Sequence, residues 1–174
     1  QAAGEAPNPV PMDPAALGLS VAAFLIFCAL SSSTYLINDV IDREADRQHP
    51  LKRCRPIAAG DVSPGLALAT AVVLGGVAVA GATRIQPAFG LVAAIYLSMF
   101  AAYSRVLKHI VILDVLTIAI GFVLRAAAGA IAISVPISHW LLVCTILGAL
   151  FLGLCKRRHE LTLLADAAPG HRRI

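Results

Sequence analysis

Three aspartates with helical spacing are the residues of this sequence that most clearly indicate chemistry. Asp39, Asp42 and Asp46 lie three and then four residues apart, so on a helix their carboxylates would share one face. Three like charges on one face repel each other unless a cation lies against them. Carboxylate oxygens suit Mg²⁺, which commonly bridges protein carboxylates to substrate phosphates. The aspartates, with Asn38 beside them, predict a site for Mg²⁺ and a diphosphate; the alternative is a solvated acidic helix end neutralised by neighbouring arginines.

A basic segment follows the aspartates directly. Lys52, Arg53 and Arg55 lie between two prolines, which favour an extended backbone, and the segment ends at Gly60. These cations could bind the phosphate oxygens that a metal ion does not reach. Taken singly, each of them could equally determine membrane topology or contact anionic lipids.

Further charged residues lie beside or within apolar runs. Asp114 is one helical turn inside such a run, where an unpaired carboxylate is costly, so a partner or a cavity is expected. Lys108 could bind phosphate or extend to the membrane surface as an anchor. Arg125 lies eleven residues beyond Asp114 and is either functional or a structural arginine bonded to a neighbouring span.

A second basic cluster follows the last apolar run. Lys156 and Arg157 are adjacent, and Glu160 lies one helical turn beyond Lys156. Lys156 and Glu160 could simply form an exposed i,i+4 pair. With Arg157 they could also contribute to the same site as the aspartates.

The elements that position these residues are expected to be membrane-spanning helices. The sequence is 59% hydrophobic and 14% charged, with a mean hydropathy of +0.82, which is typical of a membrane protein. Spanning segments must satisfy their backbone hydrogen bonds internally, and the alternation of a barrel is missing. We therefore predict an all-α, polytopic transmembrane helical bundle with about five spans, near residues 15–38, 62–83, 87–104, 110–133 and 138–155.

Lys and Arg are distributed unevenly among the connections. The connections after the first, third and fifth segments are basic, whereas the second holds Arg84 alone and the fourth, 134–138, holds none. By the positive-inside rule the basic connections face the cytoplasm. We predict a protein integral to the cytoplasmic membrane (inner or plasma membrane) with its site on the cytoplasmic side. Residues 1–14 are expected to be a polar N-terminal segment or loop, 15–161 the membrane domain, and 162–174 a cytoplasmic loop or tail.

The motifs together resemble a known family. Asn38 to Asp46 (NDVIDREAD) and Lys52 to Gly60 (KRCRPIAAG) are similar to the first signature of the UbiA superfamily of intramembrane prenyltransferases. Within it they resemble the decaprenyl-phosphate phosphoribosyltransferase branch, as do Tyr103 to Asp114 (YSRVLKHIVILD), Arg125 and Lys156 to Leu161 (KRRHEL). The wider superfamily usually has a second motif, DxxxD, but here Ile118 follows Asp114. Family members have about nine spans, so five would form part of a larger fold.

The resemblance implies Mg²⁺-dependent transfer of a 5-phosphoribosyl group from phosphoribosyl diphosphate to a polyprenyl (decaprenyl) phosphate, with release of diphosphate. Its implied partners are those two substrates and membrane lipids, with no nucleic acid. Asp114 would accept a hydrogen bond from a ribose hydroxyl or hold a basic residue. The implied metal ligands are Asn38, Asp39, Asp42 and Asp46. The implied catalytic residues are Asp39, Asp42, Asp46, Lys108 and Asp114. The implied substrate-binding residues are Asn38, Lys52, Arg53, Arg55, Tyr103, Arg125, Lys156, Arg157 and Glu160.

Two other functions compete with this one. A prenyl diphosphate could be the donor to an aromatic or lipid acceptor, but only 6% of the residues are aromatic and Asp114 lacks an acidic partner at position 118. The protein could also be a transporter or a lipid-binding scaffold. Transporters usually carry polar or broken helices near the middle of the membrane, whereas here the polar residues gather at one surface.

Overall fold

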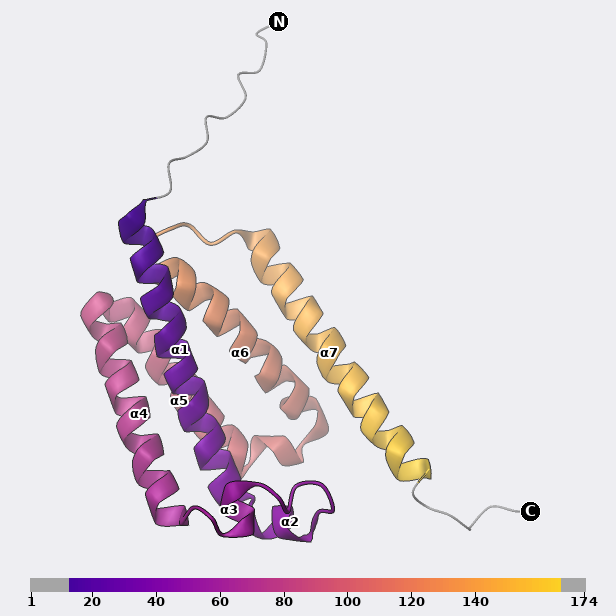
Figure 1. Cartoon of the computed structure of the whole chain (residues 1–174). Coiled ribbons are helices and arrows are strands. Elements are labelled where there is room, and N and C mark those ends of the chain that lie inside the picture. Colours follow the sequence, from indigo (N-terminus) through magenta and orange to yellow (C-terminus); the bar gives the residue numbers. More distant parts are fainter. Residues whose placement is uncertain (1–12, 167–174) are drawn as a thin grey trace, which may run out of the picture.

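The computed structural model describes residues 13–166, with backbone only for residues 109, 111 and 160–166 (Figure 1). These residues form helices and their connections alone, which confirms the predicted all-α fold. In chain order the helices are α1 (Pro14–Ile41), α2 (Arg43–Gln48), α3 (Pro56–Ala59), α4 (Pro64–Ile85), α5 (Pro87–Arg105), the 3₁₀ helix η1 (Leu107–His109), α6 (Val111–Ala132) and α7 (His139–Asp166).

Five of the described helices are long and apolar enough to cross a bilayer. The candidate spans are Pro14–Ile41, Pro64–Ile85, Pro87–Arg105, Ile112–Ala132 and His139–His159. They match the predicted segments to within a few residues, except that the first and last run further toward their C-termini. The chain is therefore an integral membrane protein with five candidate spans.

Proline and polar caps set where several spans begin. Pro14, Pro64 and Pro87 each lie in the first turn of a helix, where the missing N–H has no intrahelical partner to lose. The Asp13 carboxylate accepts from Ala15 N at 2.9 Å, and the Ser63 hydroxyl accepts from Leu66 N at 3.3 Å. These residues fix the ends of α1, α4 and α5, and therefore the lengths of the connections between them.

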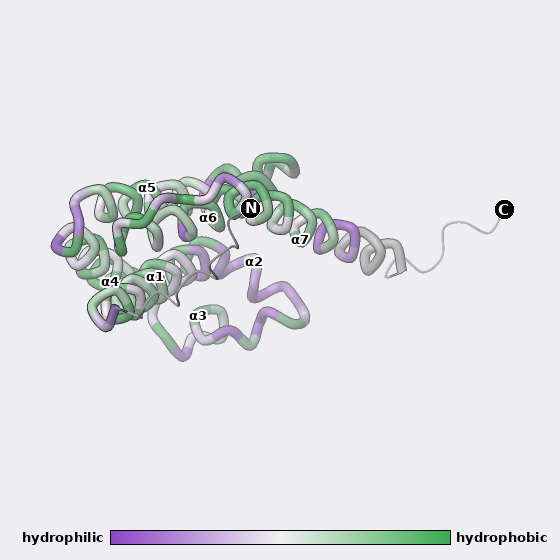
Figure 2. Tube along the Cα trace, turned by 90° about the horizontal axis from the view of Figure 1, so that it is seen from above, coloured by the Kyte–Doolittle hydropathy of each residue, from purple (hydrophilic) through white to green (hydrophobic). Residues whose placement is uncertain are grey.

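Helices α1, α4, α5 and α6 pack into one group, and α7 lies along α6 at its edge (Figures 1 and 2). The core of the group contains Leu30, Phe89 and Tyr96, each at most 1% exposed, surrounded by buried alanines. Successive spans run in opposite directions (Figure 1). The C-terminal ends of α1, α5 and α7 therefore lie at the same end of the molecule as α2, α3 and η1, and we call this the polar end.

Small residues let the spans approach closely. A methyl group at Gly90 would lie 2.8 Å from the backbone Cα of Thr83, so α4 and α5 meet almost backbone to backbone there. The Ser33 hydroxyl of α1 donates to the carbonyl of Ala71 in α4 at 2.7 Å. Close contact of this kind fixes the relative positions of α1, α4 and α5.

Candidate active site

The aspartate motif lies where α1 gives way to α2. We call Asn38, Asp39, Asp42 and Asp46 the acidic cluster. The predicted single helical stripe needs correction, because α1 ends at Ile41 and Asp42 separates it from α2. Helical hydrogen bonding nevertheless passes through this point, since Asp42 N donates to Asn38 O and Asp46 N donates to Asp42 O, both at 2.8 Å. The interruption therefore leaves the aspartates near one another.

The basic segment folds back onto the acidic cluster. Nη1 of Arg55 lies 2.9 Å from a carboxylate oxygen of Asp39 and 2.9 Å from one of Asp46. Asp46 is only 4% exposed, so its pairing with Arg55 offsets a considerable desolvation cost. The basic segment was predicted to be extended, but only part of it is. It includes the helical turn α3, which ends at Gly60 in the left-handed region (φ 98°).

Arg47 holds this fold-back in place. Its Nε donates to the carbonyl of Ala58 in α3 at 2.9 Å, which ties α2 to α3 and so places Arg55. Arg47 is one of the arginines that would neutralise the acidic helix end in the alternative interpretation of the motif. Nothing in the spacing of the sequence indicates a bond from its side chain to a backbone carbonyl eleven residues away.

Lys108 brings a distant part of the chain to the acidic cluster. It lies in η1, and its Nζ forms an ion pair with the Asp42 carboxylate and a 3.5 Å contact with Asn38 Oδ1. Because 66 residues separate Lys108 from Asp42, the pairing depends on the packing of α5 and α6 beside α1. The structure thus brings together Lys108, Arg55 and the whole acidic cluster.

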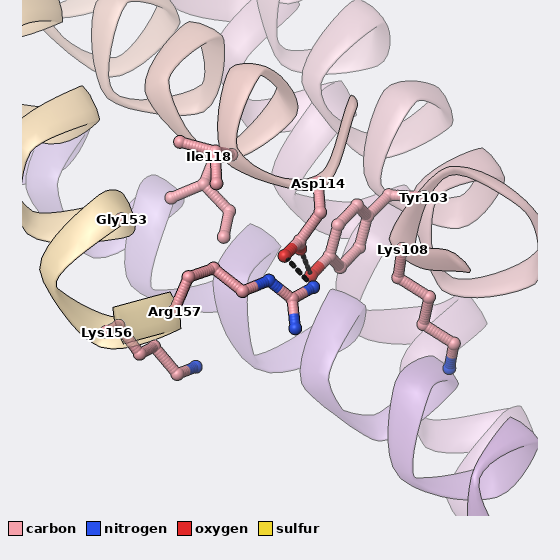
Figure 3. Close-up of a pocket in the computed structure, with 8 residues that line it drawn as sticks. Tyr103, Lys108, Asp114, Ile118, Gly153, Lys156 and Arg157 are labelled. Atoms are coloured by element: carbon pink, nitrogen blue, oxygen red, sulfur yellow. Dashed lines mark hydrogen bonds and ion pairs between the residues drawn. The ribbon is translucent and has the colours of Figure 1, made fainter. Parts of the chain in front are cut away.

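A second set of charged residues lines a cavity of about 230 Å³ next to Lys108 (Figure 3). We call it the cationic cavity; its polar lining is Tyr103, Lys108, Asp114, Lys156 and Arg157. Val115, Ile118 and Gly153 complete the wall. Ile118 lies at the position of the second aspartate of the DxxxD motif, and it contributes an apolar surface to the cavity.

Asp114 binds two of the other side chains that line the cationic cavity. The Tyr103 hydroxyl donates to its Oδ1 at 2.6 Å, and Arg157 forms an ion pair with its Oδ2. Figure 3 shows the Arg157 guanidinium directed at Asp114, while Lys108 points away from that pair. Of the two roles considered for Asp114, this geometry favours the one in which it holds a basic residue.

Other predicted site residues are less closely involved. Lys52 and Arg53 are exposed in the connection between α2 and α3, and within residues 13–159 neither forms an ion pair. Lys156 is exposed beside the cationic cavity. The Glu160 side chain lies outside the described residues. Arg125 is not brought to the polar end: its guanidinium donates to the hydroxyls of Tyr96 and Ser31.

The carboxylates of the acidic cluster have only part of the arrangement of a metal site. Within the described part of the chain, no three His, Cys, Asp or Glu side chains are arranged to hold a metal ion directly. The donor chemistry nonetheless suits a hard divalent cation, because Asp39 and Asp46 each direct an oxygen at the same nitrogen of Arg55. Two carboxylates that converge on one positive point could receive a Mg²⁺ ion there.

Comparison with known proteins places this arrangement in a family. The UbiA prenyltransferase family matches residues 3–159, most of the sequence. The chain belongs to this family. The resemblance drawn from the motifs is therefore confirmed, and the five spans are those of a UbiA-type membrane protein.

Individual relatives are consistent with the branch that the motifs indicated. The chain is 45% identical over 141 residues to a decaprenyl-phosphate phosphoribosyltransferase of Mycobacterium tuberculosis, covering 81% of this chain and 47% of the relative. Proteins of the same name from Mycolicibacterium smegmatis and Corynebacterium glutamicum are 42% and 38% identical, each over 81% of this chain and over 44% and 43% of the relative. The chain thus spans about half the length of the curated relatives it matches.

Proposed function

We propose that this UbiA family protein takes part in Mg²⁺-dependent transfer of a 5-phosphoribosyl group from phosphoribosyl diphosphate to a polyprenyl phosphate. The observation that carries the proposal is the pairing of two charged sites at the polar end. The acidic cluster and the cationic cavity lie side by side, and Lys108 contributes to both. The names of the relatives, decaprenyl-phosphate phosphoribosyltransferases, support the same substrates.

Two adjacent sites fit a donor that has phosphate at both ends. Phosphoribosyl diphosphate carries a diphosphate on the anomeric carbon and a separate phosphate on carbon 5 of the ribose. The diphosphate would lie at the acidic cluster, and the 5-phosphate would lie in the cationic cavity among Lys108, Lys156 and Arg157. A prenyl diphosphate has phosphate at one end only, and its apolar chain would leave the cationic cavity without an anion.

The residues of the chain would bind and orient this donor. Asp39 and Asp46 would hold Mg²⁺ at the point on which their oxygens converge, with Asn38 and Asp42 beside them, and the bound ion would neutralise charge that develops on the leaving diphosphate. Arg55, whose Nη1 would leave that point to the ion, would then bind phosphate oxygens with its N–H groups. Asp114 and Tyr103 keep Arg157 directed into the cationic cavity.

The acceptor requires little activation by the protein. The oxygen of a polyprenyl phosphate is already anionic, so it can attack the anomeric carbon without a strong general base. The new bond joins that oxygen to the anomeric carbon, and the bond from this carbon to the diphosphate breaks. The product is a polyprenyl phosphoribose. The polyprenyl chain would remain in the membrane, while its phosphate reaches the polar end at the membrane surface.

Ligand binding to the purified chain tests the donor separately from turnover. With Mg²⁺ present, phosphoribosyl diphosphate should raise the unfolding temperature more than diphosphate alone or ribose 5-phosphate alone, because only the intact donor fills both sites. Geranyl diphosphate should have a smaller effect than phosphoribosyl diphosphate. A larger shift with geranyl diphosphate would contradict the proposal.

Turnover distinguishes the reactions themselves. Membranes that contain the protein would be incubated with labelled phosphoribosyl diphosphate and polyprenyl phosphate, and in parallel with labelled geranyl diphosphate and a quinone precursor. We expect labelled lipid from the first pair, dependent on Mg²⁺ and lost in Asp42→Ala. Labelled lipid from the second pair alone would show a prenyltransferase instead. An unchanged rate in Asp42→Ala would show that the acidic cluster is not the site.

A further inference from the structure

Arg125 carries a partly buried charge that the proposed reaction does not use. Its guanidinium donates to the hydroxyls of Tyr96 and Ser31, and it lies 5.3 Å and 5.2 Å from the ring centroids of Tyr96 and Phe122. Its Nε is buried and has no hydrogen-bond partner among the described residues. All four of these contacts are with neutral groups, so none of them neutralises the charge.

The position of Arg125 along the helices places this charge near the middle of the membrane. Tyr96 lies nine residues from either end of α5, roughly 14 Å at 1.5 Å per residue. Ser31 lies ten residues before the end of α1, roughly 15 Å from the polar end. A charge at this depth is costly and normally has an anionic partner or lines a water-filled space.

Three cations of the polar end have carboxylate partners. Arg55 pairs with Asp39 and Asp46, and the remaining two pairs are Lys108 with Asp42 and Arg157 with Asp114. For Arg125, by contrast, no carboxylate of the described residues lies within ion-pair distance.

Arg125 also borders an open groove. Residues of α1 and α6, with Leu141 of α7, line a groove of about 760 Å³ that includes Phe24, Ser31 and Arg125. Phe24 is 67% exposed, so the groove presents a large apolar side chain. The part of the groove formed by α6 has only small side chains, at Ala126, Gly129 and Ala130. A methyl group at Gly129 would meet nothing within 4 Å. Small residues at this spacing allow a helix to approach closely.

The depth of Arg125 excludes two sources of its counter-ion. A lipid phosphate stays at the surface, about 15 Å from the centre of a hydrocarbon core roughly 30 Å thick, so it does not reach Arg125. A second copy of this chain does not supply the anion either. None of the ten acidic residues of the sequence lies more than three residues inside a candidate span.

We propose that the groove between α1 and α6 binds a further membrane-spanning helix that carries an Asp or Glu at mid-span, and that this carboxylate pairs with Arg125. Charge complementarity at mid-membrane depth carries the argument, and the apolar lining with its small residues suits a helix face. The relatives extend to about twice the length that this chain covers, so further spans of such a protein are a natural source of the helix. The inference does not depend on the proposed reaction.

A designed peptide can test this with the chain as it is. The probe is a peptide of roughly 20 leucines with one central glutamate and a dansyl group at one end, mixed with the protein in uncharged phosphatidylcholine vesicles. Trp140 is the single tryptophan and directly precedes Leu141 of the groove, so energy transfer from Trp140 to dansyl reports binding. Matched peptides carry a central glutamine, or the glutamate one turn from an end.

We expect the central-glutamate peptide to bind at least tenfold more tightly than either matched peptide. In Arg125→Met, which keeps an unbranched side chain without charge, this preference should disappear; in Arg125→Lys it should persist. Equal binding of all three peptides would overturn the proposal, as would a preference that survives Arg125→Met. Displacement of the peptide by added phosphatidylglycerol would assign the groove to anionic lipid and would also overturn it.

Discussion

Lys108 is the side chain that joins the two parts of the candidate site. It contacts Asp42 and Asn38 on one side and lines the cationic cavity on the other. A lysine can do this because its ammonium group is a compact charge on a flexible stem. If both phosphate groups of the donor bind as proposed, Lys108 lies between them and favours both.

Replacement of Lys108 by methionine should therefore weaken binding of phosphoribosyl diphosphate. Met keeps much of the length of the side chain but removes a charged hydrogen-bond donor, a loss of about 1.5–3 kcal/mol, or roughly 10- to 100-fold in affinity. Titration calorimetry with Mg²⁺ present would measure it. Arg84→Met is the matched control, because Arg84 is exposed at the end of α4 that lies away from the polar end. Equal losses in both variants would mean that general positive charge, rather than the position of Lys108, determines binding.

In the proposed site, Asp114 would act by holding Arg157 rather than by contacting the substrate. Asp114→Asn keeps the shape of the side chain but removes the charge that pairs with Arg157, so we expect the free energy of unfolding to fall by about 1–3 kcal/mol. Inorganic phosphate should also protect the protein less against heat, because Arg157 loses its ion pair with Asp114. Tyr103→Phe removes a neutral donor from the same carboxylate and should cost about 1 kcal/mol. A larger loss in Tyr103→Phe than in Asp114→Asn would contradict this ranking.

At the level of elements, the contact between α4 and α5 determines how closely the spans pack. A methyl group at Gly90 would lie 2.1 Å from Thr83 Oγ1 and 2.8 Å from its Cα, and the backbone atom has no easy way to move aside. Gly90→Ala should therefore destabilise the protein by about 1–3 kcal/mol. Gly76→Ala in α4 is the control, since nothing lies within 4 Å of the added methyl, and it should be neutral or slightly stabilising. Thermal unfolding in detergent would compare them, and equal stability would show that the two helices separate at little cost.

The spans were predictable because hydrophobic length is a local property. Pro64 and Pro87 mark helix starts directly, and runs of apolar residues mark the membrane-spanning lengths. The acidic cluster was predictable for a similar reason, since the spacing of three and four residues is visible within residues 39–46 of the sequence. The interruption at Asp42 was not, because its backbone lies close to helical (φ −85°, ψ 0°) and no residue type there signals a break.

The long-range pairings could not be derived from local pattern. Arg157 and Asp114 are 43 residues apart, and Lys108 and Asp42 are 66 apart, so both pairs follow from which spans are neighbours. The role of Tyr96 also escaped prediction. An aromatic residue in a span usually packs or lies at the membrane interface, and only the fold shows that its buried hydroxyl accepts from Arg125.

At the scale of the whole molecule, the acidic cluster and the cationic cavity both lie at the polar end, whereas the spans are joined by short connections at the opposite end. Figure 2 shows the hydrophilic segment around α2 and α3 projecting from a group of largely apolar helices. An asymmetry of this kind suits an enzyme that takes a soluble donor from one compartment and a lipid acceptor from the membrane. The orientation of the chain in the membrane therefore determines from which side a soluble donor would reach the polar end.

The distribution of Lys and Arg predicts that the polar end faces the cytoplasm. Cys54 lies exposed between α2 and α3 at that end, and Val135 lies exposed in the connection between α6 and α7 at the other. In a variant that keeps Cys54 alone, with the other three cysteines changed to serine, a membrane-impermeant maleimide should label only permeabilised cells. With Cys54 also removed and Val135→Cys introduced, the same reagent should label intact cells. Labelling of Cys54 in intact cells would show the opposite orientation. A donor as highly charged as phosphoribosyl diphosphate does not cross a bilayer unaided, so a cytoplasmic supply of it would then not reach the acidic cluster.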